Sequence, residues 1–94
     1  MTVEPIRVLV NGESLTTIAT TDRGLLYGDG LFETIACVKG APQQWQAHMQ
    51  RLQSGCEHLG IGRIDTDLLQ EECLGLLEGV PRGVLKVIIT RGTG

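Results

Sequence analysis

Residues 31–59, LFETIACVKGAPQQWQAHMQRLQSGCEHL, contain the change of pattern that decides the fold. Residues 31–39 are rich in apolar and β-branched side chains and predict a strand. A turn at Lys39–Pro42 leads into a short strand expected near residues 43–45. Apolar residues then recur at steps of four and three, which predicts a helix over residues 46–59. The apolar face of this helix consists of Trp45, Met49, Leu52, Cys56 and Leu59.

The same reasoning extends toward the C-terminus. Gly60 stands where a left-handed residue commonly ends a helix. Asp65 is a candidate N-cap for a second helix near residues 66–78. Its apolar face is formed by Leu69, Cys73, Leu76 and Leu77. Residues 84–90, VLKVIIT, predict another strand.

Toward the N-terminus, residues 6–10 predict a strand that ends at Asn11-Gly12, a strong hairpin signal. A second strand is therefore expected near residues 14–18, followed by a structured loop over residues 20–30. The loop glycines, Gly24, Gly28 and Gly30, favour tight turns, although a backbone nest for an anion is the alternative. Their spacing matches neither common nucleotide-binding motif.

These elements predict an α/β (α+β) fold, with a mainly antiparallel sheet and two helices on one face. Both faces of the predicted strands are largely apolar, so both should be covered. Two helices cover only one face. The face that carries Phe32, Thr34, Lys86 and Ile88 should therefore be open, or covered by a partner or another part of the polypeptide.

Composition narrows the functional class. Ninety-four residues are enough for one small domain. A net charge of −3 and scattered basic residues disfavour a nucleic-acid partner. No apolar run is long enough to span a membrane, and no signal-peptide pattern is present, which favours a cytoplasmic protein. The three cysteines are expected to be reduced and buried.

Few residues suggest chemistry by themselves. Arg51 lies beside the apolar stripe of its helix, where its guanidinium could bind a carboxylate or phosphate, or form a surface salt bridge. Lys86 lies mid-strand among apolar neighbours. It could act as a nucleophile or base, pair with a substrate carboxylate, or protect an edge strand against aggregation. His48 and His58 are poorly spaced for a metal and favour a solvated helix face, so no metal site is expected.

Two motifs resemble a known family. They are the D-R-G-x-x-x-G-D-G-x-F-E-T run, Asp22–Thr34, and the H-x-x-R-L run, His48–Leu52. Together with Val10-Asn11-Gly12 and Thr90–Gly94, they resemble the N-terminal part of the fold-type IV pyridoxal-phosphate enzymes. That family includes aminodeoxychorismate lyases, D-amino acid transaminases and branched-chain aminotransferases. The stretches 47–59 and 83–87 look most like the lyases.

The resemblance implies specific roles. Arg51 matches the arginine that holds the phosphate of pyridoxal 5′-phosphate (PLP), the cofactor of the family. Phe32 matches a position that lines the substrate pocket, and Lys86 one that faces the substrate carboxylate. The lysine that forms the Schiff base with the cofactor is expected beyond Gly94, so no catalytic residue is expected among residues 1–94.

The resemblance therefore predicts that residues 1–94 are the small N-terminal domain of a larger two-domain enzyme, a truncated form that lacks the C-terminal domain and is inactive alone. The complete enzyme would be a homodimer that cleaves 4-amino-4-deoxychorismate to 4-aminobenzoate and pyruvate, a step toward folate. The alternatives are a D-amino acid or branched-chain-type aminotransferase of the same fold, and a non-catalytic ligand-binding module. A large exposed apolar patch disfavours an isolated module.

Overall fold

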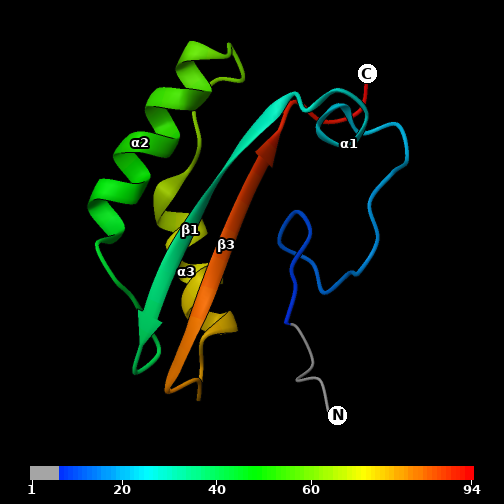
Figure 1. Ribbon diagram of the computed structural model, residues 1–94. Helices are drawn as coiled ribbons and strands as arrows, with labels where there is room; N and C mark the ends of the chain where they lie inside the picture. Colours follow the sequence, from blue (N-terminus) through cyan, green and yellow to red (C-terminus); the bar gives the residue numbers. More distant parts are fainter. Residues whose placement is uncertain (1–6) are drawn as a thin grey trace.

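The sheet is built around one long antiparallel pair of strands. The computed structural model describes residues 7–94, and its elements are α1 (Arg23–Tyr27), β1 (Gly30–Val38), β2 (Ala41–Pro42), α2 (Trp45–His58), α3 (Thr66–Leu76) and β3 (Arg82–Thr90). The strand order is β2-β1-β3, and every neighbouring pair is antiparallel. β1 and β3 lie side by side from Gly30↔Thr90 to Val38↔Arg82 (Figure 1).

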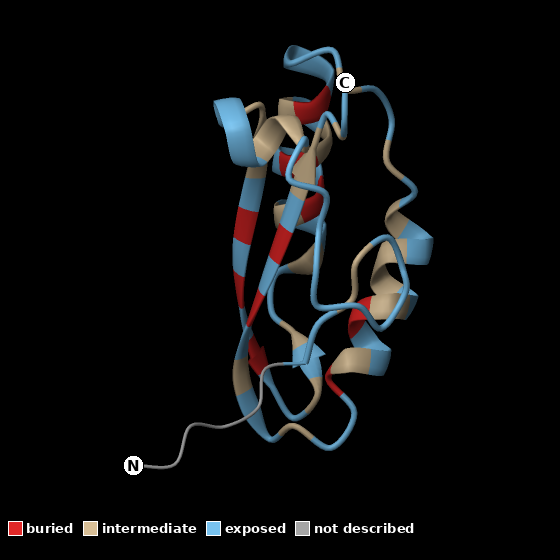
Figure 2. Ribbon diagram, turned by 90° about the vertical axis from the view of Figure 1, so that its right-hand side faces the viewer, coloured by how far each residue is buried: buried red, intermediate tan, exposed pale blue. Residues whose placement is uncertain are grey.

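The core lies between this strand pair and the helices α2 and α3. Buried and exposed residues alternate along both strands, so one face of the strand pair is buried and the other is exposed (Figure 2). The buried core comprises Ile35, Cys37, Met49, Leu52, Cys73, Leu77, Leu85 and Val87. The predicted α+β class, with an antiparallel sheet and two helices on one face, is confirmed.

The helical stripes are confirmed with one exception. Buried or half-buried positions include Trp45, Met49, Leu52, Cys56, Leu69, Cys73 and Leu76. Leu59 is wrongly placed in the core by the periodicity, because it follows the end of α2 at His58 and is 38% exposed.

The predicted helix ends have the expected chemistry. Gly60 is left-handed, with a φ of 71°, and the Ile61 amide donates to the Cys56 carbonyl oxygen at 2.9 Å. The Asp65 carboxylate caps α3 by accepting from the Leu68 amide at 3.0 Å. All three cysteines are free and buried, and burial raises the pKa of the Cys73 thiol to about 11.

Four expectations outside the core are wrong. The expected loop over residues 20–30 contains the short helix α1, capped by Asp22, whose carboxylate accepts from the Gly24 amide at 2.8 Å. Asn11 and Gly12 form a turn with positive φ, but the pairing stops at Val10↔Glu13 and residues 14–18 form no strand.

The short strand is at Ala41–Pro42 rather than residues 43–45, because α2 already begins at Trp45. Residue 6 of the strand expected over residues 6–10 lies outside the described residues, and residues 7–10 form no strand beyond the isolated bridge at Val10. No helix within residues 7–94 is long and apolar enough to cross a membrane.

Candidate functional site

The open face of the sheet is the first part of the candidate site. Phe32 is 57% exposed, Val84 72% and Ile88 61%, and Thr34 and Lys86 are exposed on the same face. Helices α2 and α3 pack on the opposite face, against Ile35 and its core neighbours. The expectation that this face is left open by the chain's own helices is confirmed.

Phe32 and Lys86 lie together on the open face. Phe32 pairs with Ile88 and Thr34 with Lys86 in neighbouring positions of the register. The Lys86 ammonium lies 4.5 Å from the centroid of the Phe32 ring, which is a cation–π contact. Lys86 is exposed, so its ammonium is open to solvent and to a ligand on this face. A positive charge beside an aromatic ring suits an anionic ring compound.

A hollow opens beside this pair, between α1 and the adjoining ends of β1 and β3. Its volume is about 190 Å³, and its walls include Phe32, Ile88, Leu25 and the backbone at Gly28 and Gly30. The open face therefore has a recess next to its aromatic–cation pair.

The D-R-G-x-x-x-G-D-G run holds α1 against the end of β3. Asp29 accepts from Arg23 Nε at 2.9 Å and from Arg91 Nε at 2.7 Å, and these two guanidinium groups, Arg91 first, lower the pKa of its carboxyl. Asp22 accepts from the Thr90 hydroxyl at 2.9 Å. The run therefore connects two distant parts of the chain and forms one wall of the hollow.

Of the three glycines of that run, only Gly28 follows the turn interpretation, because Gly24 lies inside α1 and Gly30 begins β1. Gly28 is left-handed, with a φ of 65°, and ends α1. Gly24 lies against Thr90, where any side chain would collide with the Thr90 methyl group. Gly30 faces the Ile89 carbonyl oxygen at similarly close range. These positions require glycine for conformation and close packing.

A charged cluster lies on the helix-covered side of β1. Arg51 on α2 donates to Glu33 through Nη2 at 2.8 Å and through Nε at 3.0 Å. His48 Nδ1 lies 2.7 Å from the same Glu33 Oε1 atom. Glu33 is the one buried charged residue within residues 7–94. The Arg51 guanidinium, with a smaller contribution from His48, lowers the pKa of Glu33, and Glu33 in turn raises the pKa of Arg51.

His48 therefore differs from the expectation of a solvated face. Its side chain is only 16% exposed, because Glu33 draws the imidazole inward from α2. His58 is exposed, as expected. Within residues 7–94 no group of three potential ligands is arranged to hold a metal ion.

Arg51 has the donors that a phosphate needs. Glu33 accepts from Nε and Nη2, Nη2 also lies 3.4 Å from His48 Nδ1, and within residues 7–94 Nη1 makes no hydrogen bond. The Arg51 side chain is 69% exposed, so the edge formed by Nη1 and Nη2 faces outward. That edge presents two parallel N–H donors, which is the geometry of bidentate phosphate contacts. The residue fits a phosphate group, and it also forms the salt bridge that was the alternative.

The predicted site residues fall into two groups. Phe32 and Lys86 are brought together, whereas Arg51 lies on the other side of β1. β1 connects the two groups, because Phe32 and Glu33 are consecutive residues whose side chains lie on opposite faces of the sheet. Sequence reasoning missed Glu33 as a partner of Arg51. Its signal was a carboxylate at the inward-facing position shared with Ile35 and Cys37.

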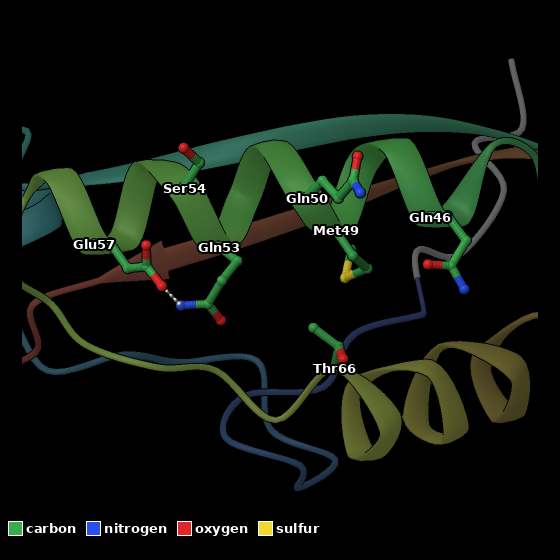
Figure 3. A pocket seen from close by; sticks show the side chains of 7 residues that line it. All are labelled: Gln46, Met49, Gln50, Gln53, Ser54, Glu57 and Thr66. Carbon is green, nitrogen blue, oxygen red and sulfur yellow. Dashed lines mark hydrogen bonds between the residues drawn. The ribbon is translucent and has the colours of Figure 1, made fainter.

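A second hollow, of about 330 Å³, lies along the outer side of α2 near the start of α3 (Figure 3). Gln53 crosses it, accepting from the Ile64 amide at 3.0 Å and donating to Glu57 at 3.4 Å. Amide side chains dominate its lining. Gln53 fastens the connection between the two helices, so this hollow is explained by packing.

Several known proteins are similar to this chain in sequence and in structure. No protein-family model matches the chain. A solved fold IV-transaminase from Curtobacterium pusillum superposes with a TM-score of 0.77 and 30% identity, over 84% of this chain and 30% of that chain. The chain is therefore similar to a fold-type IV enzyme over about a third of that enzyme's length.

Two further relatives are more specific. The solved 4-amino-4-deoxychorismate lyase from Pseudomonas aeruginosa is 43% identical, with a TM-score of 0.80, over 89% of this chain and 31% of that chain. An aminodeoxychorismate lyase from Vibrio harveyi is 33% identical over 90% of this chain and 31% of its own length. The chain spans about a third of the relatives that it matches. The resemblance to fold-type IV enzymes, and to aminodeoxychorismate lyases among them, is confirmed.

Proposed function

We propose that this chain forms the small domain of a PLP-dependent aminodeoxychorismate lyase, which cleaves 4-amino-4-deoxychorismate to 4-aminobenzoate and pyruvate. The observation that carries the proposal is the likeness to the solved lyase from Pseudomonas aeruginosa, at 43% identity over 89% of the chain. The open face with Phe32 and Lys86, and the outward guanidinium edge of Arg51, support it independently.

In the proposed enzyme, Arg51 binds the phosphate of PLP through its Nη1–Nη2 edge. PLP supplies an electron sink when it is bound, and the protein supplies orientation and charge around it. A guanidinium suits this task because two charge-assisted hydrogen bonds fix the phosphate in both position and rotation. Arg51 remains protonated throughout, since Glu33 raises its pKa further. Its contribution is binding and orientation rather than proton transfer.

Phe32 and Lys86 bind the substrate on the open face. Aminodeoxychorismate is a ring compound with carboxylate groups. The Phe32 ring offers an apolar surface to the substrate ring, and the Lys86 ammonium offers a charge to one carboxylate. The hollow beside Phe32 gives the bound ring a recess from which water is partly excluded. Neither side chain is assigned a covalent step.

The rest of the proposal concerns parts of the relatives that this chain does not span. The lysine that binds PLP covalently is expected there, and residues 1–94 are proposed to be inactive alone. We also propose that the complete enzyme is a cytoplasmic homodimer in which the open face of the sheet is covered. Residues 32 and 88 on that face are apolar and exposed, and a second domain or subunit would remove them from water.

Product analysis of the complete gene product tests the function. Incubation with aminodeoxychorismate and PLP should release 4-aminobenzoate and pyruvate without any keto-acid acceptor. The second candidate function is amino-group transfer, which the likeness to the fold IV-transaminase favours. Formation of a new amino acid only when a keto acid is present would support that candidate and overturn lyase activity. Failure to bind PLP at all would instead support a non-catalytic module.

A further inference from the structure

Glu33 occupies an unusual position for a carboxylate. It alternates with Ile35 and Cys37 on the buried face of β1, and it is 8% exposed. Removing a carboxylate from water is costly unless charged partners compensate. Here three donors converge on its Oε1 atom, namely Arg51 Nε, Arg51 Nη2 and His48 Nδ1, and Arg51 Nε also donates to Oε2 at 3.2 Å. Both oxygens of the Glu33 carboxylate therefore have hydrogen-bond donors.

The Arg51 guanidinium is held by Glu33 on one edge only. Glu33 binds two adjacent donors of the guanidinium: Nε lies 3.0 and 3.2 Å from the two carboxylate oxygens, and Nη2 lies 2.8 Å from Oε1. The outer part of the side chain is 69% exposed. A carboxylate that accepts from two N–H donors of one guanidinium restricts the plane of that group as well as its position. The outer edge is thus held in one direction although its surroundings are open.

We infer that Glu33 is a positioning residue, which holds the Arg51 guanidinium in the orientation that receives the PLP phosphate. This inference rests on the proposed function, because it assumes that Arg51 contacts that phosphate. An exposed arginine loses rotamer freedom when it binds a ligand, and that ordering weakens binding. Glu33 has already ordered the side chain. His48 supports Glu33 by hydrogen bonding its Oε1 atom at 2.7 Å.

A purely structural role is the competing explanation, since the same contacts fasten α2 to β1. Gln53 provides a matched control because it also fastens α2, but to the following connection, through the Ile64 amide at 3.0 Å and the Gly62 carbonyl oxygen at 3.3 Å. Gln53→Ala should lower stability without any effect on the phosphate. Glu33→Gln keeps the shape of the side chain but replaces one acceptor oxygen with a donor that opposes the guanidinium.

The test measures PLP and pyridoxal affinity by absorbance titration of the complete gene product. Pyridoxal lacks the phosphate and is otherwise the same probe. Glu33→Gln should weaken PLP binding by about 3- to 10-fold, which is the effect of having to order one long side chain, and should leave pyridoxal binding unchanged. In an Arg51→Ala background, Glu33→Gln should have no further effect on PLP, because the group that it positions is gone.

Each contrary result has a distinct meaning. If Arg51→Ala weakens PLP binding and Glu33→Gln does not, the positioning role is wrong and the phosphate contact stands. If Glu33→Gln weakens PLP and pyridoxal equally, as a general loss of structure would, the positioning role is also wrong. If Arg51→Ala leaves PLP affinity unchanged, both the phosphate contact of the proposed function and the positioning role are wrong. Glu33→Asp keeps the charge, but its side chain is one methylene shorter, so it should weaken PLP binding as Glu33→Gln does.

Discussion

Gly24 offers a sharp test of how the D-R-G run is packed, because two opposing effects act on one substitution. Gly24 lies in the first turn of α1, and its φ is not positive, so alanine suits the backbone conformation. In an open helix, glycine to alanine stabilises a protein by about 0.5–1 kcal/mol. At this site the new Cβ would lie 2.9 Å from Thr90 Cβ and closer still to the Thr90 methyl group.

Thr90 cannot turn away freely. Its hydroxyl donates to Asp22 at 2.9 Å and accepts from the Gly92 amide at 3.0 Å, which fixes the rotamer. Overpacking of this kind costs about 1–3 kcal/mol. After subtracting the gain in helix propensity, Gly24→Ala should destabilise the protein by about 1 kcal/mol.

Urea unfolding of the complete gene product measures the difference, with Gly75→Ala as the matched control. Gly75 lies inside α3, and a Cβ there meets nothing within 4 Å. The control should be stabilised by about 0.5–1 kcal/mol, so the two variants should shift in opposite directions. Thr90→Ser, which removes the methyl group and keeps the hydroxyl, should recover part of the loss in the double variant. Stabilisation by Gly24→Ala equal to that of the control would refute the packing described for α1.

Three further predictions concern the core and the charged cluster. Leu52 is fully buried, so Leu52→Ala should cost about 2–5 kcal/mol in urea unfolding; Leu59→Ala, at a position 38% exposed, should cost markedly less, and equal losses would contradict the described core. Arg51→Ala should weaken PLP binding by about 2–4 kcal/mol in a cofactor titration, whereas unchanged affinity would leave only its salt bridge with Glu33. Folding lowers the pKa of Glu33, so the ionised carboxylate stabilises the protein fully above the ordinary carboxyl pKa, and this stabilisation is lost as the pH falls through the lowered pKa. The free energy of unfolding, measured between pH 7 and pH 3, should therefore fall toward acid pH. Glu33→Gln should make that fall less steep.

Much of the fold follows from short-range pattern. The two helices and the two long strands were predictable because their hydrophobic periods persist over nine or more residues. The open face was predictable because alternation in β1 and β3 puts Phe32 and Lys86 on one side. The five-residue helix α1 is too short to display a helical period, and its Asp22 cap is hidden among turn-forming residues.

The candidate site was less predictable than the fold. Arg51, Phe32 and Lys86 were identified from motifs, yet their division between opposite sides of β1 depends on how α2 packs against the strand. The contact between Glu33 and Arg51 joins residues 18 positions apart, on two different elements. Local pattern does not encode such a pairing, because it depends on the position of the helix over the strand.

In the proposed enzyme, this domain binds two different anions on opposite sides of one strand: the cofactor phosphate at Arg51, and the substrate carboxylate at Lys86. The most direct measurement is the KM for aminodeoxychorismate beside the Kd for PLP in Lys86→Met, a variant that keeps an apolar chain over the Phe32 ring. We expect the KM to rise by about 10- to 100-fold, which corresponds to the loss of one charged contact, and the Kd for PLP to stay unchanged. An unchanged KM, or a Kd for PLP that rises with it, would contradict the claim.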